Sequence, residues 1–446
     1  MNRLLACTAA LLCLTSVFAQ GEPPMTQDKI SYIDNGVIRV GVNLGLGGAI
    51  TYVSKSGSEE NLINSADWGR QIQMSHYSGP VPFAPNGKQP QKVWEGLGWN
   101  PIQCGDCFGN RSKILTHTND GKALYVKCIP MQWPLNNEPG ECTFECWITL
   151  EGNAIQVRAR TLNNRSDKTQ YQGRDQELPA IYTNAPWYRL MTYSGDKPFT
   201  NDNLREIPPQ FPWASWQGTE NWAALINEAG NGIGVWEPGV YSIIGGFAGK
   251  PGKGGPKDGP TGYIAPLHRE ILDHNIDYNF KYTLIVGSIV EIRQYVYAHA
   301  ERPKAPSWRF DKDRQHWIYV NATDAGWPIT GELKIALDGG DPQMLSPTAF
   351  WQAADAPRLY IEAAFTAERT NAEIFWSRAD APGFAEGRTA AFAIIPDGQY
   401  HVYEVDLSAS PEYRGSITGL RIDPTPGGKP GEFVRVKSVG FQKPPA

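Results

Sequence analysis

The 446-residue chain has no long apolar run, no basic block and few helical patterns. Beyond its first 19 residues, no stretch reaches the ~18 apolar residues that a membrane-spanning helix needs. Net charge is −5 at pH 7 and no cluster of Lys and Arg stands out, which argues against nucleic acid as a partner. Apolar residues at helical spacing are scarce before residue 290, which disfavours a helical fold.

Several catalytic and metal-binding motifs are also missing. There is no H-E-x-x-H and no EF-hand spacing, so we predict no bound metal. The patterns G-x-S-x-G and the phosphate-binding glycine loop are absent too, which leaves serine nucleophile chemistry without support. A single C-x-x-C, Cys104 to Cys107, has no second such pair or nearby His pair to complete a zinc site. We therefore predict no cofactor.

The first 19 residues have the pattern of a secretory signal peptide. Arg3 gives a short positive region, an apolar stretch runs from residue 4 to 17, and small residues precede an expected cut after Ala19. This predicts a secreted or periplasmic protein without a membrane span.

Five cysteines follow the signal peptide, within about forty residues of one another. In an exported protein they predict disulfides, with one thiol left over. Cys142 and Cys146 share a face of a strand-like run but are too far apart to bond each other, so each is expected to pair with a neighbour such as Cys128 or Cys104.

Aromatic residues, glycine and proline are abundant: 15 Trp, 19 Tyr, 16 Phe, 46 Gly and 35 Pro. Short alternating runs joined by turn residues predict an all-β fold. Residues 303–306, PKAP, read as a linker, because each proline fixes its own φ and extends the residue before it. The linker predicts two units, one over 29–302 and a β-sandwich or jelly roll over 307–443.

Two stretches resemble known families. NGVIRVGVNLGLGGAITYV, NLINSADWGRQIQ, GYIAPLHREIL and YNFKYTLIVGS resemble the galactose-mutarotase-like supersandwich, over roughly Lys29 to His299. YHVYEVDLS, ITGLRIDP and VRVKSVGF look like the carbohydrate-binding jelly rolls that follow many glycan-degrading enzymes. The resemblance implies a carbohydrate ligand, a polysaccharide or an oligosaccharide, held on a polar concave sheet.

The stretch SADWGRQIQMSHYSG, residues 65–79, is predicted to be a strand of that sheet. Alternation puts Gln71, Gln73, Ser75 and Tyr77 on one face, and Arg70, Ile72, Met74 and His76 on the other. Arg70 suits sugar hydroxyls or a carboxylate, His76 suits proton transfer, and Tyr77 suits stacking. The alternative is that Arg70 pairs with Asp67 and that His76 is a solvated strand end.

The glycine-rich stretch GLGWNPIQCGDCFGN, residues 96–110, supplies residue types that contact sugars. Trp99, Asn100 and Asp106 are the candidates there, and the alternative is an ordinary loop bounded by a disulfide.

Two pairs of ionisable residues complete the predicted site. Asp175 and Glu177 share one face of a strand, and the apolar residues that follow Glu177 favour it as the acid. His268 and Glu270 are also two apart; the resemblance implies a His acid and a late Glu base, and Glu270 matches that position by context. Alternatively, Arg174 and solvent neutralise the first pair, and His268 and Glu270 are loop residues.

The leading hypothesis is an exported glycoside hydrolase in which Glu177 and Glu270 act as acid and base while Arg70 and His76 position the substrate. The second is a polysaccharide lyase with His268 or Tyr182 as base. The third is a glycan-binding protein without catalysis. In the first unit, the candidates for stacking on sugar, or else core residues, are Trp213, Trp216, Trp222 and Trp236. In the second unit the candidates are Trp327, Trp351 and Trp376, and the alternative is that this unit only supports the first.

Overall fold

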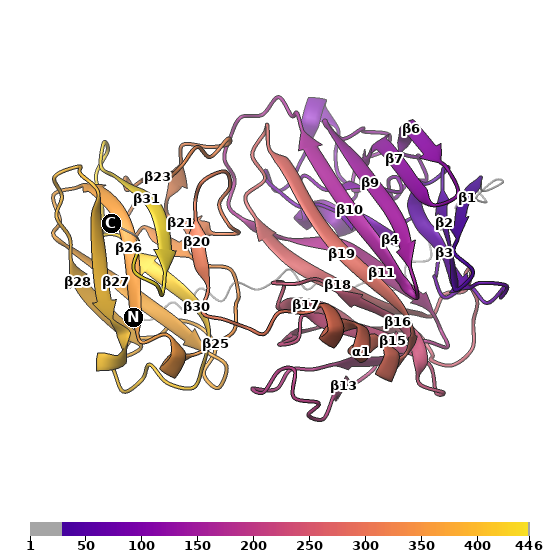
Figure 1. The fold of residues 1–446 in the computed structure, drawn as a ribbon. Helices are drawn as coiled ribbons and strands as arrows, with labels where there is room; N and C mark the ends of the chain where they lie inside the picture. Colours follow the sequence, from indigo (N-terminus) through magenta and orange to yellow (C-terminus); the bar gives the residue numbers. More distant parts are fainter. Residues whose placement is uncertain (1–28, 445–446) are drawn as a thin grey trace.

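The protein is described by a computed structural model that covers residues 29–444, so the predicted signal peptide lies outside the described residues. Two β-sheet bodies lie side by side (Figure 1). The N-terminal body ends with helix α1 (Ile289–His299), and the C-terminal body begins with β20 (Ser307–Arg309). The predicted all-β class is confirmed. None of the helices within residues 29–444 is long and apolar enough to cross a membrane.

The N-terminal body is a stack of two large antiparallel sheets, as expected of a supersandwich. Sheet 1 has ten strands, eight of them in the order β1 (Ile30–Asp34), β2 (Ile38–Asn43), β3 (Ala49–Lys55), β4 (Ile72–Ser75), β11 (Arg174–Asn184), β18 (Thr261–Glu270), β17 (Ser242–Ala248) and β14 (Ala214–Gln217). The short strand β5 (Pro101–Ile102) pairs with β4, and β8 (Met131–Gln132) pairs with β5. Sheet 2 has nine, in the order β13 (Arg205–Ile207), β12 (Arg189–Thr192), β15 (Trp222–Ile226), β16 (Asn231–Trp236), β19 (Asp277–Ser288), β10 (Ala154–Asn163), β9 (Cys142–Glu151), β7 (Ala123–Ile129) and β6 (Lys113–Asn119).

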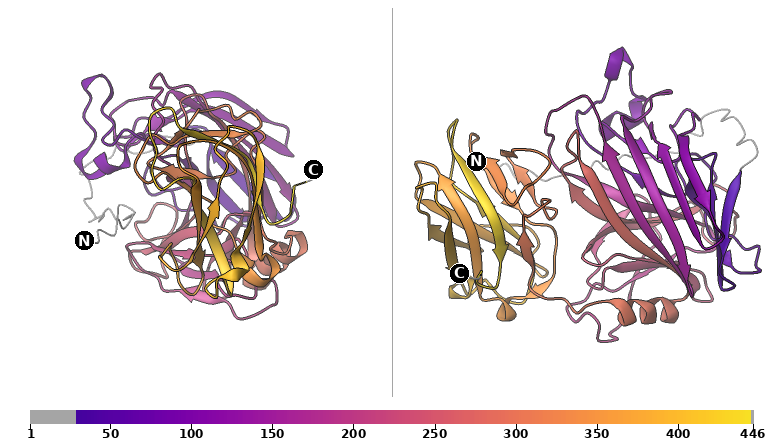
Figure 2. Two further views of the ribbon diagram at one scale, coloured as in Figure 1. Left: turned by 90° about the vertical axis from the view of Figure 1, so that its left-hand side faces the viewer. Right: turned by 45° about the horizontal axis from the view of Figure 1, so that its top comes forward.

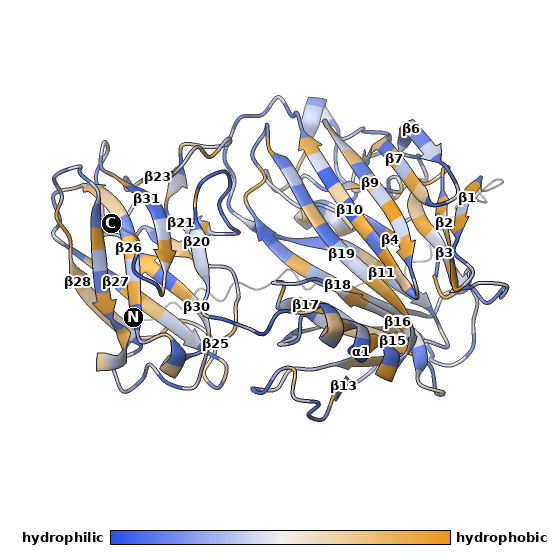
Figure 3. Cartoon of the chain, in the orientation of Figure 1, coloured by the Kyte–Doolittle hydropathy of each residue, from blue (hydrophilic) through white to orange (hydrophobic). Residues whose placement is uncertain are grey.

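Alternation along the strands builds one core between the two sheets. The inward residues of both sheets are aliphatic or aromatic and nearly all buried, which the alternating bands of Figure 3 make visible on β10 and β19. Because the side-chain period of a strand is two, the other residues of each strand point out of the sandwich. The outer face of sheet 1 therefore carries its own, smaller cluster, which includes Ala180, Tyr263 and Ala265.

Helix α1 covers part of the outer face of sheet 2, below the strands in Figure 1. It agrees with the one helical pattern of this half of the sequence. Ser288 accepts a hydrogen bond from the backbone N–H of Glu291, whose side chain returns to the backbone of Ser288, a capping box that starts the helix. Ile292 and Val296 pack on the tryptophan-rich face of β15 and β16.

The C-terminal body is a second sandwich of two six-stranded sheets. One contains β22 (Thr323–Asp324), β23 (Leu333–Ala336), β31 (Phe433–Gly440), β26 (Arg358–Thr366), β29 (His401–Asp406) and β20; the other contains β21 (Ile318–Val320), β24 (Gln343–Leu345), β30 (Ser416–Asp423), β27 (Asn371–Arg378), β28 (Thr389–Ala393) and β25 (Trp351–Gln352). Figure 2 shows this body from its end and from above. Its core is aromatic, with Trp308, Trp317 and Trp376 buried inside.

The two bodies are joined by buried contacts as well as by the linker. Arg314, 3% exposed, reaches Asp273 of the N-terminal body at 2.5 Å and Asp324 of its own body at 2.6 Å. Ile271, one residue after β18, packs into the C-terminal core. Since charged and apolar groups of both bodies are buried together, the space between the bodies has a defined shape.

Candidate functional site

The three central strands of sheet 1 place a carboxylate among tyrosines on the outer face. Glu177 of β11 is opposite Ser75 of β4 and Leu267 of β18. Tyr77 follows β4, and Tyr182 and Tyr263 face each other across β11 and β18. A register shift follows Glu177 at the Leu178–Pro179 pair, a bulge at which proline loses no ladder hydrogen bond.

Electrostatics favour the protonated form of Glu177. Burial raises the pKa of its carboxyl, while the hydroxyl groups of Tyr263 and Tyr77 lower it by a smaller amount. Burial and the Glu177 charge together hold the pKa of Tyr182 well above its usual range. Glu177 is thus suited to donate a proton, whereas Tyr182 is a poor base, which weakens the lyase mechanism that assigned it that role.

A row of aromatic rings extends from this carboxylate. Tyr182 and Tyr263 lie 4.8 Å apart between ring centroids, and Trp213 lies 4.9 Å from Tyr263 at an interplanar angle of 32°. Trp213 packs over Gly246 of β17, where an added Cβ would lie 3.1 Å from its ring. Trp213 and Tyr182 are half-buried, so part of each ring stays open to a ligand such as a sugar face.

An ion pair borders the same face. Arg70 lies 2.9 Å from Asp67, as the simpler interpretation of the sequence expected, and it also donates to the backbone carbonyl of Gly259. The charges of Asp67 and Arg70 both act on the phenol of Tyr182, which places the ion pair near that ring. Asp67 is a second carboxylate that the sequence analysis treated only as a partner of Arg70. We call Asp67, Arg70, Tyr77, Glu177, Tyr182, Trp213 and Tyr263 the Glu177 site.

Glu270 does not belong to this site. The β11–β18 register sets Arg174 opposite Glu270, three positions from the pair of Glu177 and Leu267. An odd offset on a pleated strand changes the face, so Glu177 points out of the sandwich and Glu270 points into it. The predicted acid and base are therefore separated by the sheet and cannot act on one glycosidic bond.

His268 and Glu270 share the inner face, as their spacing predicted, and they meet groups that the sequence analysis missed. His268 Nε2 lies 3.0 Å from a carboxylate oxygen of Glu237, and its Nδ1 lies 2.8 Å from the Tyr278 hydroxyl. Glu270 pairs with His316 of the C-terminal body. No sequence spacing connects these residues, because Glu237 follows a different strand and His316 lies beyond the linker.

His76 is buried rather than solvated. It is fully inaccessible, its Nε2 lies 2.7 Å from the Thr161 hydroxyl, and its ring packs edge-on against Phe144. Burial lowers the pKa of its imidazole to about 3. His76 is therefore neutral near pH 7, and its place in the core leaves it without access to a substrate.

The glycine-rich stretch contributes structural residues instead of sugar contacts. Trp99 is 1% exposed in the main core, and Asn100 donates to the backbone carbonyl of His76. Asp106 is buried and accepts backbone N–H groups of its own loop and of Asn137. Asp175 lies exposed on β11, 3.8 Å from Arg269.

Most of the other tryptophans proposed as sugar platforms are core residues. Those at 10% exposure or less are Trp216, Trp222, Trp236, Trp351 and Trp376. Trp327 packs against the cores of both bodies. Trp213 is the candidate that keeps a half-buried ring on the surface of the Glu177 site.

The expected disulfides are not formed. The buried cysteines of sheet 2 and its neighbourhood, Cys104, Cys128, Cys142 and Cys146, are free thiols. Burial raises the pKa of Cys146 to about 12, so the thiol stays protonated. Cys107 is half-buried, with its Sγ 3.1 Å from a side-chain oxygen of Gln91. Over residues 29–444, no three His, Cys, Asp or Glu side chains are grouped to hold a metal ion.

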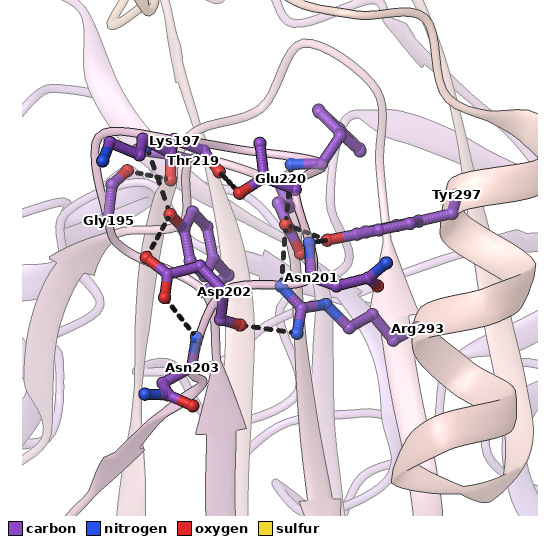
Figure 4. Close-up of polar contacts among 12 residues, drawn as sticks. Gly195, Lys197, Asn201, Asp202, Asn203, Thr219, Glu220, Arg293 and Tyr297 are labelled. Atoms are coloured by element: carbon purple, nitrogen blue, oxygen red, sulfur yellow. Dashed lines mark hydrogen bonds and ion pairs between the residues drawn. The ribbon is translucent and has the colours of Figure 1, made fainter.

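A further buried carboxylate has a structural role. Glu220 is inaccessible and its oxygens accept hydrogen bonds from Tyr297 at 2.6 Å, Trp222 at 2.9 Å and Arg293 at 3.1 Å (Figure 4). The backbone N–H of Phe199 donates to it as well. This network ties the loop before β13 to helix α1.

No protein-family model matches the sequence, and no curated protein matches it. Similar solved structures include two galactose mutarotase-like proteins. The one from Clostridium acetobutylicum has 7% identity and a TM-score of 0.38, over 60% of this chain and 98% of its own. The one from Lactobacillus casei has 11% identity and a TM-score of 0.37, over 58% of this chain and 99% of its own.

A 4-alpha-glucanotransferase from Thermococcus litoralis is similar as well, at 11% identity and a TM-score of 0.32, over 59% of this chain and 38% of its own. All three TM-scores are below 0.5, so no residue role passes from these proteins to this chain.

Proposed function

We propose that the protein is a carbohydrate-active enzyme that hydrolyses a glycosidic bond at the Glu177 site. The observation that carries the proposal is a carboxyl group of raised pKa beside a row of partly open aromatic rings. Aromatic rings bind the C–H faces of sugars, and a carboxyl whose pKa is raised can act as the acid that gives its proton to a leaving oxygen.

Two carboxylates have distinct roles in this proposal. Glu177, shielded among tyrosines, is the general acid that protonates the glycosidic oxygen. Asp67, held by Arg70 at 2.9 Å, is the second carboxylate, which supports the positive charge developing at the anomeric carbon or activates water. Arg70 thereby positions Asp67 and leaves its remaining N–H groups for sugar hydroxyls.

The test is a product assay with a panel of neutral and uronate-containing polysaccharides. New reducing ends without absorbance of unsaturated uronates mean hydrolysis, and Glu177→Gln is expected to lower the rate by ~100-fold or more. Asp67→Asn should lower it as well. Asp175→Asn is the matched control, since Asp175 lies two residues from Glu177 on the same face, is exposed and is paired weakly.

Three results would contradict the proposal. Reducing ends with unsaturated-uronate absorbance would mean a lyase. Equal activity of Glu177→Gln and Asp175→Asn would remove Glu177 from the chemistry. Retention on a polysaccharide gel without any product would mean a binding protein.

A further inference from the structure

A large cleft separates the two bodies, and its lining includes Asp175 and Leu267, which flank Glu177 on β11 and β18. Its volume is about 1480 Å³, enough for several sugar rings. One wall comes from the N-terminal body near β18 and β19 and the other from loops of the C-terminal body. A half-buried aromatic ring stands on each wall, Tyr241 on the first and Phe384 on the second.

The floor of the cleft is polar. Glu237 and His268 line it at 5% and 3% side-chain exposure, and Tyr278 and His316 lie beside them. Both ring nitrogens of His268 are already occupied, Nε2 by Glu237 and Nδ1 by the Tyr278 hydroxyl, so this pair closes the end of the cavity with a polar surface. A polar floor and aromatic walls together resemble a binding site more than a packing defect, which would be apolar and dry.

Two cations on one wall stand next to each other without acidic partners. Arg158 of β10 and Lys281 of β19 are directly opposite in the strand register, and both side chains are exposed on the same face. Neither forms an ion pair with any of residues 29–444. Like charges directly opposite on neighbouring strands repel, so this pair is a cost to the fold unless an anion lies between them.

The guanidinium of Arg158 is already oriented before any ligand binds. Its guanidinium lies 3.9 Å from the ring centroid of Trp147, on the next strand of the sheet. Stacking orients the planar group while its N–H donors remain open at the rim of the cleft. A bound carboxylate or sulfate would meet a donor that loses little side-chain entropy on binding.

The charge of the cleft differs from that of the chain. The chain carries −5, but its cleft is lined by Arg158, Arg205, Arg269, Lys281 and Lys304 against Asp175, Asp196, Glu237 and Asp380. Two of those carboxylates, Asp175 and Asp380, already lie near arginines. The unpaired charge that remains at Arg158 and Lys281 is positive.

We propose that the cleft between the two bodies binds an acidic saccharide, with its anionic groups on Arg158 and Lys281 and its ring faces on Tyr241 and Phe384. The shared chemistry is a carboxylate or sulfate group on a sugar ring. Glu177 does not line this cleft, and the proposal does not depend on the function proposed at the Glu177 site.

The experiment measures binding of the purified protein to three oligosaccharide probes: an oligogalacturonate, a sulfated galactan fragment and a neutral glucan fragment. Titration calorimetry at two salt concentrations is expected to show binding of an anionic probe that weakens with salt. The double variant Arg158→Gln/Lys281→Gln should weaken that binding tenfold or more. The two anionic probes distinguish carboxylate from sulfate recognition.

The matched control is Lys113→Gln/Lys122→Gln, which removes the same charge at exposed positions on the far edge of sheet 2. Glu177→Gln should bind the anionic probe as the wild type does, even if hydrolysis is lost. Equal weakening by the control, no effect of the Arg158/Lys281 variant, or absence of binding to both anionic probes at low salt would each overturn the proposal. Phe384→Ala removes the aromatic ring that the C-terminal body contributes to the cleft. If this variant binds the anionic probe with unchanged affinity, the saccharide does not span both bodies.

Discussion

Glu270 of the N-terminal body and His316 of the C-terminal body form an ion pair across the domain boundary. The carboxylate is 7% exposed and the imidazole 47% exposed, so the pair lies at the edge of the buried interface. His316 and the preceding Gln315 both have positive φ, a left-handed conformation that costs energy for residues with a Cβ. The ion pair is one interaction that holds this strained turn against the first body.

The ion pair predicts a pH-dependent stability. Burial alone would lower the pKa of His316, but Glu270 raises it to about 9. In the unfolded chain the pKa is about 6.5, so the protonated pair stabilises the fold fully below pH ~6.5 and its contribution disappears as pH rises through 9. We expect about 1 kcal/mol, because solvent screens the half-exposed ring. Thermal unfolding between pH 6 and pH 10 measures it.

The variant His316→Gln should lack this component and unfold with a flatter pH profile above pH 6.5. His401→Gln is the control, since His401 pairs with Asp397 on the surface of a single body. A profile of His316→Gln identical to that of the wild type would show that the pair does not contribute.

Replacing Arg314 should cause a large loss of folding stability. Its guanidinium satisfies Asp273 and Asp324, whose side chains are 4% and 0% exposed. Arg314→Met would leave two buried carboxylates without a counter-charge, which typically costs about 3–5 kcal/mol. Urea unfolding monitored by tryptophan fluorescence gives this value. Arg309→Met, which loses an exposed pair with Asp311, should change the free energy of unfolding little. An equal loss of stability in Arg309→Met and Arg314→Met would show that the buried ion pairs of Arg314 are not what stabilises the interface.

The protonation of Glu177 should set the pH above which activity falls, the alkaline limb of the pH profile. A general acid works only while protonated, so hydrolysis should fall as pH rises through the raised pKa of Glu177. The Tyr77 hydroxyl lowers that pKa, so Tyr77→Phe should move the alkaline limb to higher pH. A profile of kcat/KM against pH measures the shift. A lower rate with an unmoved limb would mean that Tyr77 only binds substrate.

Because His76 is buried as a neutral imidazole, the folded protein should lose stability in acid. Its folded pKa is about 3, below the ~6.5 of the unfolded chain, so its stabilising contribution is present above pH 6.5 and is lost as pH falls toward 3. The slope from this one residue is ~1.4 kcal/mol per pH unit. Urea unfolding at pH 4, 5 and 6 should show a smaller slope for His76→Gln than for His117→Gln. An NMR titration in which His76 changes charge between pH 5 and 7 would contradict its neutral, buried state.

Local patterns of the sequence predicted much of the fold. Alternation placed Ile72 and Met74 on the core face of β4 and Tyr77 beyond it on the other, and the two-residue spacing placed His268 and Glu270 on one face. The helical pattern after residue 290 became α1. Each of these follows from the period of one element, which neighbouring residues alone fix.

The candidate site was predicted only in part. Tyr77, Glu177 and Tyr182 lie on one face, and Arg70 acts on Tyr182 there, although alternation had put Arg70 on the face opposite Tyr77. Trp99 and Asp106 are buried by loops that the sequence gives no means of placing. Cysteines close in sequence suggested disulfides, yet four of them are separate thiols inside the core.

The sequence by itself determined the all-β class, the face on which each residue of a strand lies, and the supply of aromatic and acidic groups. The tertiary structure decided which residues of distant strands and of the two bodies lie next to each other. The register between β11 and β18, strands some ninety residues apart, put Glu177 and Glu270 on opposite sides of a sheet. The register between β10 and β19 aligned Arg158 with Lys281, and the packing of the two bodies created the cleft and brought His316 to Glu270. Strand register and domain docking follow from summed long-range packing, which no local pattern of residues encodes.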